Sequence, residues 1–201
     1  MKTIVLSLVA LALTATSVSA APTRVEGGLI AGAEKDGVRT WLGVPYAAAP
    51  IGQNRWRAPQ PVVAWKGVKD TTAFSPNCRQ TATWIPKPQS EDCLALDICA
   101  PDCAPGARKP VIAWIHGGAF TSGAGSLPWY GGSTLARKGD VVTVGINYRL
   151  GALGFLYLPG LSSGNLGLKD QVLALQWIKQ NIRHFGGDPD NITVMGQSAG
   201  G

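Results

Sequence analysis

The chain has 201 residues, of which 45% are hydrophobic and 15% charged, a composition typical of a folded protein rather than a disordered one. That length is sufficient for one domain with a substantial core. The net charge of +6 is scattered, and no run of basic residues is long enough to indicate a nucleic-acid-binding track. We therefore expect a globular domain that does not bind nucleic acid.

The first 20 residues have the pattern of a secretory signal peptide. Lys2 supplies a positive charge, residues 4–15 are mostly apolar, and Val18-Ser19-Ala20 is a small-residue cleavage site. The apolar stretch is too short to span a bilayer, and no later segment is apolar enough to do so. We predict cleavage after Ala20 and a soluble mature protein that is secreted or periplasmic.

The cysteines fit such an oxidising compartment. There are four, namely Cys78, Cys93, Cys99 and Cys103. Their order alone leaves all three pairings open. A zinc site is the alternative, but the pair Cys99 and Cys103 lacks a second ligand pair at a suitable spacing. We expect no metal and no other cofactor.

The first half of the chain is expected to form short strands. Strand-like runs cover residues 24–30, 38–44, 62–65 and 94–99. A hairpin turn at 33–37 is expected to join the first two. The last run alternates as a strand does, although the charged Asp97 is unusual within it. Cys78 and Cys93 flank a polar, proline-containing loop.

The second half alternates between strands and helices. Continuous apolar runs at 111–115 and 141–146 indicate strands buried on both faces of a sheet. A short helix is expected at 135–138, a long one at 167–183 and a last strand at 192–194. The apolar positions that predict the long helix are Leu168, Val172, Leu175, Ile178 and Ile182. This alternation predicts an α/β fold with a mostly parallel central sheet covered by helices.

The last strand leads into Gly196-Gln197-Ser198-Ala199-Gly200, a G-x-S-x-G nucleophile elbow. In such an elbow the serine occupies a tight strand-to-helix turn. The turn brings the residues two before and two after the serine together, so side chains larger than glycine would clash there. Ser198 is therefore the candidate nucleophile.

The same pattern occurs once more, at Gly160-Leu161-Ser162-Ser163-Gly164. Ser162 follows Leu158-Pro159, which is a turn signal rather than a strand. Because the context of a nucleophile elbow is a strand before and a helix after, we interpret Ser162 as a loop residue.

A serine nucleophile needs donors for the developing oxyanion and a base for its proton. His116-Gly117-Gly118-Ala119-Phe120 follows a central strand, as the HGG-type oxyanion motif does, and the Ala199 N–H follows the nucleophile directly. Where a serine elbow of this kind is part of a catalytic triad, the order along the chain is Ser, acid, His. Only Ala-Gly-Gly follows Ser198 here. His116 lies in the oxyanion motif and His184 at the end of the long helix, so neither is expected to be the base.

These motifs, with others in the same order, identify the chain as similar to the N-terminal part of the type-B carboxylesterases. That group includes the cholinesterases and the non-catalytic neuroligins. The matching blocks are Gly43-Val-Pro-Tyr-Ala47, Arg55-Trp56 with Pro59, Glu91-Asp-Cys-Leu94, Trp114-Ile-His-Gly-Gly-Ala-Phe120, Asn147-Tyr-Arg-Leu-Gly-Ala-Leu-Gly-Phe155, Gly164-Asn-Leu-Gly167, Asp170-Gln171 with Ala174-Leu-Gln-Trp177, Asn181-Ile182, and Phe185-Gly-Gly-Asp-Pro189 into Gly196-Gln-Ser-Ala-Gly-Gly201.

The resemblance implies an α/β-hydrolase fold with helices on both sheet faces and a small N-terminal antiparallel sheet. It implies Ser198 as the nucleophile. It implies an oxyanion hole formed by the N–H groups of Gly118, Ala119 and Ala199, and a disulfide between Cys78 and Cys93. The remaining two cysteines are then available to pair with each other. The resemblance also relates Trp84 to the aromatic residue lining the cholinesterase gorge, although ordinary loop packing is the favoured explanation of Trp84.

Two departures from the family pattern qualify this interpretation. Gln197 stands where the family usually has Glu, and the acid and His of family members lie in a part absent here. We therefore expect residues 21–201 to be the N-terminal part of a single catalytic domain. The function implied is an exported serine carboxylesterase acting on small ester substrates. The alternatives are a neuroligin-like interaction module, which the intact Ser198 disfavours, or an inactive fragment.

Overall fold

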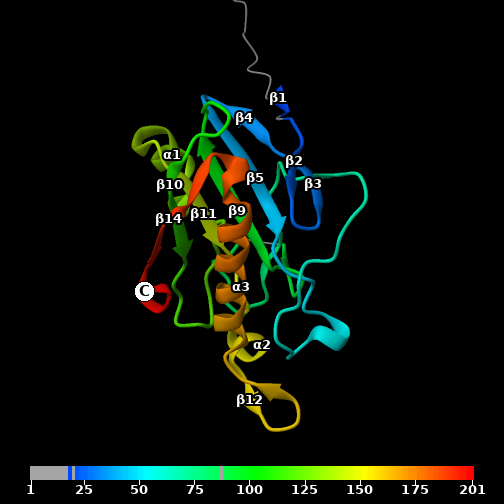
Figure 1. The fold of residues 1–201 in the computed structure, drawn as a ribbon. Coiled ribbons are helices and arrows are strands. Elements are labelled where there is room, and N and C mark those ends of the chain that lie inside the picture. Colours follow the sequence, from blue (N-terminus) through cyan, green and yellow to red (C-terminus); the bar gives the residue numbers. More distant parts are fainter. Residues whose placement is uncertain (1–17, 20, 87) are drawn as a thin grey trace, which may run out of the picture.

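The structure, a computed structural model, describes residues 18–19, 21–86 and 88–201. Most of the expected signal peptide thus lies outside the described residues. A seven-stranded sheet forms the centre (Figure 1). Its order is β1 (Val18–Ser19), β4 (Ala33–Lys35), β5 (Val38–Pro45), β9 (Ala95–Pro101), β11 (Val142–Ile146), β10 (Lys109–Ile115) and β14 (Gly187–Gly196). Cleavage after Ala20 would remove β1 and leave β4 at the edge.

The sheet is mixed. The three strands predicted from apolar runs in the second half, β10, β11 and β14, are parallel neighbours. The pairs among β1, β4, β5, β9 and β11 are antiparallel. Parallel neighbours need a crossover connection, and helices supply it only for the last three strands. The parallel character predicted for the sheet is therefore confined to that half.

Helices cover both faces of this sheet. Helix α3 (Leu166–Asn181) crosses the front of the sheet in Figure 1, whereas α1 (Ser133–Gly139) packs on the other face. Alternation along β9 shows this directly, because Leu96 clusters with Trp177 of α3, while Cys99 clusters with Ala136 of α1. Asp97 thus shares the α1 face.

The inward face of α3 differs from the one predicted. Ile178 and Ile182 are buried as predicted, but Leu168 and Val172 are 43% and 55% exposed. Asp170, which the apolar pattern left out, is buried instead. The helix is rotated so that the Asp170 carboxylate receives bonds from Arg149 Nε at 2.8 Å and Nη2 at 2.6 Å. Both side chains are buried, so this ion pair fixes α3 against the segment that follows β11.

The N-terminal region forms a separate three-stranded sheet of β2 (Thr23–Val25), β3 (Gly28–Ala31) and β6 (Val68–Asp70). The single strand predicted at 24–30 is therefore two strands, which turn at Gly27, where φ is +95°. Residues 62–65, which are described, do not form the predicted strand, and β6 begins later, at Val68. Trp65 instead packs on this hairpin and donates from Nε1 to Leu29 O at 2.9 Å. Of the three strands, β2 and β3 are antiparallel and β3 and β6 parallel.

The remaining elements are short. They are η1 (Gly52–Asn54), β7 (Asn77–Cys78), β8 (Gln89–Ser90), η2 (Pro128–Tyr130), α2 (Gly151–Phe155), β12 (Tyr157–Leu158), β13 (Ser162–Ser163), η3 (Ile182–Phe185) and η4 (Ser198–Gly200). Strands β12 and β13 form the hairpin below α2 in Figure 1. No helix in the described part of the chain is both long and apolar enough to cross a membrane.

Candidate active site

Ser198 occupies a strained turn at the end of β14. Its φ is +56°, in the left-handed region, where an L-residue other than glycine costs about 1–2 kcal/mol. A Cβ on Gly196 would lie 1.8 Å from Gly200 O, and one on Gly200 would lie 2.2 Å from Ile115 O. The predicted steric need for glycine two residues before and after the serine is confirmed. The turn holds Ser198 clear of its own strand.

The His116–Phe120 loop lies beside this turn. Strands β10 and β14 are parallel neighbours with Ile115 opposite Gly196, so both motifs leave the sheet at the same edge. A Cβ on Gly117 would lie 2.4 Å from Gln197 O and 3.1 Å from Ser198 Cβ. The structure therefore brings together the two motifs that the sequence placed on separate strands.

The loop has an unusual backbone. Gly118, Ala119 and Phe120 have φ values of +120°, +52° and +60°. Within the described residues, the N–H groups of Gly118, Ala119 and Ala199 donate to no acceptor of the chain. Unengaged N–H groups beside a serine are the type of donor that an oxyanion requires.

Neither histidine is placed to act as a base for Ser198. His116 is 1% exposed, and burial lowers its pKa to about 4, so its ring is neutral near pH 7. Its Nδ1 lies 2.8 Å from Gly117 O, a distance at which Nδ1–H donates. His184 lies in η3, before the start of β14, whereas Ser198 follows the end of that strand. His116 is thus a buried residue that holds the loop backbone. His184 is separated from the serine by the length of β14.

The structure contains the disulfide between Cys78 and Cys93. The loop that it closes contacts the candidate site through Gln80, whose Nε2 donates to Gly123 O and whose Oε1 accepts from Gly123 N, both at 2.8 Å. Trp84, in the same loop, stacks on Trp129 with ring centroids 6.3 Å apart, and both are more than half exposed.

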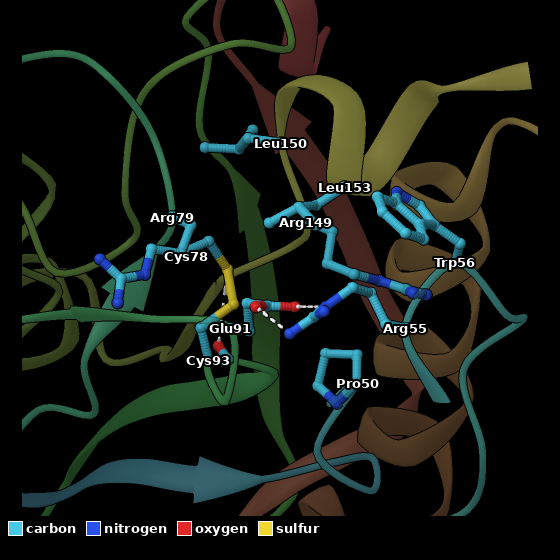
Figure 2. A pocket seen from close by; sticks show the side chains of 10 residues that line it. All are labelled: Pro50, Arg55, Trp56, Cys78, Arg79, Glu91, Cys93, Arg149, Leu150 and Leu153. Carbon is cyan, nitrogen blue, oxygen red and sulfur yellow. Dashed lines mark hydrogen bonds and ion pairs between the residues drawn. A yellow bond between two sulfur atoms is a disulfide. The ribbon is translucent and has the colours of Figure 1, made fainter. Parts of the chain in front are cut away.

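Figure 2 shows a pocket that is lined in part by this disulfide. Arg55 makes two bonds to Glu91, at 2.6 and 2.7 Å, and Trp56 lies beside them. The pocket among these side chains has a volume of about 10 Å³, room for one water molecule at most. It is therefore no substrate site.

The other two cysteines carry free thiols, which corrects the idea that they pair. Cys99 points from β9 toward α1, and Ser133 Oγ lies 3.5 Å from its sulfur. Cys103 lies beyond the end of β9, where Arg39 Nη2 is 3.1 Å from its sulfur. Cys99 and Cys103 are close in sequence but do not pair, because Cys99 faces α1 from within β9.

Asp97, the unexpected charge in β9, lines a cavity of about 320 Å³ on the α1 face. Its Oδ1 accepts from Gly43 N at 2.9 Å, at a register shift in the pairing of β5 with β9. Burial raises its pKa to about 7. Gly145 stands opposite on β11 and leaves room for the carboxyl group. The sequence pattern marked Asp97 as unusual within a strand. The Gly43 N–H that binds its carboxylate could be identified only from the structure.

Sequence reasoning did not single out Tyr148, although it belongs to one of the blocks that carry the resemblance. Its hydroxyl donates to His116 O at 2.8 Å, and its ring stacks on that of His116 at 4.4 Å. Gly151 N, three residues on, donates to Phe120 O at 2.7 Å. The segment after β11 thus contacts both ends of the His116–Phe120 loop.

Comparison with known proteins agrees with this geometry. Residues 14–201 match the Carboxylesterase family. The chain belongs to this family. It is 50% identical over 184 residues to the para-nitrobenzyl esterase of Bacillus subtilis (strain 168), which covers 87% of the chain and 37% of that relative. It is 46% identical over 177 residues to the acetylcholinesterase of Bungarus fasciatus, covering 81% and 29% respectively.

Solved structures of the family show the same fold. A PNB esterase matches with a TM-score of 0.84 at 49% identity over 89% of the chain and 38% of the esterase. A carboxylesterase of Geobacillus stearothermophilus matches with a TM-score of 0.83 at 48% identity, again over 89% and 38%. The chain therefore has the α/β-hydrolase fold, and it spans little more than a third of the length of these relatives.

Proposed function

We propose that the protein is an exported serine carboxylesterase that hydrolyses small carboxylic esters through an acyl-enzyme on Ser198. The observation that carries the proposal is the left-handed Ser198, with φ of +56°, beside Gly117 of a second strand end. The relatives named as esterases support the same reaction class.

In the proposed reaction, Ser198 Oγ attacks the ester carbonyl carbon and its proton passes to a histidine. The carbonyl oxygen gains the negative charge and accepts hydrogen bonds from the N–H groups of Gly118, Ala119 and Ala199. Collapse of this intermediate breaks the ester C–O bond, and the alcohol leaves with the proton. Water then attacks the acyl-enzyme by the same route, which releases the carboxylic acid and restores the serine.

We assign residues 21–201 to the N-terminal part of a single catalytic domain, preceded by a signal peptide at 1–20. The catalytic histidine and acid are assigned to the part of the domain that corresponds to the rest of the relatives' length. The 37% coverage of the Bacillus subtilis relative and the positions of His116 and His184 support this division.

Substitution of Ser198 tests the proposal in the complete protein. Ser198→Ala is expected to abolish hydrolysis of 4-nitrophenyl acetate. The matched control is Ser162→Ala, in the second G-x-S-x-G pattern, where Ser162 Oγ accepts from Gly164 N at 3.3 Å within a hairpin. That variant is expected to retain activity. Retained hydrolysis by Ser198→Ala would refute the assignment of the nucleophile.

The chain of residues 21–201 alone provides a second test. It holds the proposed nucleophile and oxyanion donors but neither of the groups that would transfer protons. We expect no burst of nitrophenol on mixing it with 4-nitrophenyl acetate. A burst that depends on Ser198 would show that the division of the triad is wrong.

A further inference from the structure

We propose that Tyr148 is a positioning residue of the oxyanion hole, acting through His116 to orient the N–H group of Gly118. The inference rests on the proposed function, because it concerns the donors that this function requires. It assigns a role to a buried tyrosine whose hydroxyl is hydrogen-bonded to His116 O.

The orientation of an N–H group is set by the carbonyl on the same peptide plane. Gly117 C=O and Gly118 N–H share one rigid plane and point in opposite directions. His116 Nδ1 lies 2.8 Å from Gly117 O, so the imidazole holds this carbonyl. The same contact therefore fixes the direction in which Gly118 N–H points.

The neighbouring donor is held in a corresponding way. Gly118 C=O shares its plane with Ala119 N–H. It accepts from Thr121 N and Ser122 N, both at 3.0 Å, and from the two hydroxyl groups at 3.2 Å. Ala119 N–H is thus anchored within its own loop. Gly118 N–H depends instead on the His116 ring, and hence on what holds that ring.

Tyr148 holds the ring and the backbone of His116 together. Its hydroxyl donates to His116 O at 2.8 Å, and the two rings stack at 4.4 Å with an interplanar angle of 17°. From another direction, a Cβ on Gly123 would lie 2.3 Å from His116 Nδ1, so the backbone there closes on the imidazole. Tyr148 and His116 are 0% and 1% exposed, so water is not available to replace the lost bond.

The position of Tyr148 is itself fixed. Asn147 Oδ1 accepts from Gly125 N at 2.8 Å on one side, and Arg149 binds the buried Asp170 on the other. These contacts connect helix α3 with the loop beside the serine. The left-handed φ values of Ala119 and Phe120 make such support necessary, because non-glycine residues persist in that region only where their surroundings hold them.

The test compares Tyr148→Phe with Tyr46→Phe in the complete protein. Tyr46 is a matched control, because it is equally buried and its hydroxyl donates to Asn147 O at 2.7 Å rather than to His116. We expect Tyr148→Phe to lower kcat about tenfold with little change in KM, since losing an oxyanion donor completely costs 10²–10³. The affinity of a trifluoromethyl ketone, which forms the tetrahedral oxyanion, is expected to fall by the same factor as kcat/KM.

Tyr46→Phe is expected to keep kcat within about twofold while losing comparable thermal stability. Hydrogen exchange of residues 117–121 gives a readout independent of activity, and it is expected to quicken in Tyr148→Phe alone. Unchanged exchange and ketone affinity in Tyr148→Phe, or equal losses in both variants, would overturn the inference.

Failure of the proposed function gives a different pattern. In that case Ser198→Ala retains the hydrolysis of the parent protein, whatever Tyr148→Phe does. If Ser198→Ala is inactive and Tyr148→Phe is normal in kcat, ketone affinity and exchange, only the role of Tyr148 is wrong.

Discussion

Gly117 and Ser198 come from different strand ends, yet a Cβ on Gly117 would lie 3.1 Å from Ser198 Cβ and 2.4 Å from Gln197 O. The contact exists because β10 and β14 are parallel neighbours, with Ile115 opposite Gly196. It leaves no space for a side chain between the loop and the turn.

Gly117→Ala should therefore separate the two motifs. We expect kcat/KM for 4-nitrophenyl acetate to fall at least about a hundredfold, because the methyl group meets backbone that cannot yield without moving the serine. Gly139→Ala is the matched control, since its nearest atom, Leu135 Cδ1, would be an ordinary 3.5 Å away. Equal activity of the two variants would contradict the close approach.

The strain at Ser198 has an effect on stability that is separate from chemistry. A glycine occupies the left-handed region at little cost, whereas alanine carries the same penalty as serine. Ser198→Gly is expected to be more stable than Ser198→Ala by about 1 kcal/mol in urea denaturation. Equal stability of these two inactive variants would indicate that the turn is unstrained.

Asp97 makes stability depend on pH. Burial raises the pKa of its carboxyl group from 3.8 to about 7, so between these values the folded chain keeps a proton that the unfolded chain loses. The free energy of unfolding therefore falls as pH rises through this window, by up to about 1.4 kcal/mol per unit, and levels off above it.

Asp97→Asn preserves an acceptor for Gly43 N and removes this titration. The variant is expected to gain stability over the parent protein on going from pH 5 to pH 8. Urea denaturation at both values measures the difference between the two proteins, which cancels the titration of other groups. A difference that is the same at pH 5 and pH 8 would show that Asp97 does not titrate there.

The Cys78–Cys93 disulfide joins residues 15 apart and keeps Gln80 against Gly123. Replacing both cysteines with serine is expected to cost about 3 kcal/mol of stability, mainly because the unfolded chain is less constrained. Cys103→Ser, which removes a half-buried free thiol, serves as the control and should cost far less. Similar losses in both variants would contradict a role for the crosslink itself.

Much of the fold followed from local patterns. The strands β10, β11 and β14 were predictable because buried parallel strands are continuous apolar runs. The hairpin within 24–30 was missed because the run was interpreted as one strand, although Gly27-Gly28 is a turn signal. The inward face of α3 was also missed, since it carries Asp170, whose burial depends on Arg149 from another segment.

The candidate site divides in the same way. Gly196, Ser198 and Gly200 are constrained by a turn within five residues, so their spacing alone was informative. Tyr148 acts on His116 across 32 residues through one hydroxyl and one ring stack, and no local pattern expresses such a contact.

Covalent labelling of the complete protein with a fluorophosphonate tests the central claim most directly, because this reagent reacts with an activated serine. Peptide mass spectrometry is expected to place a single adduct on Ser198, and none on Ser162, with loss of ester hydrolysis in proportion to labelling. An unlabelled Ser198 in protein that still hydrolyses 4-nitrophenyl acetate would contradict the account.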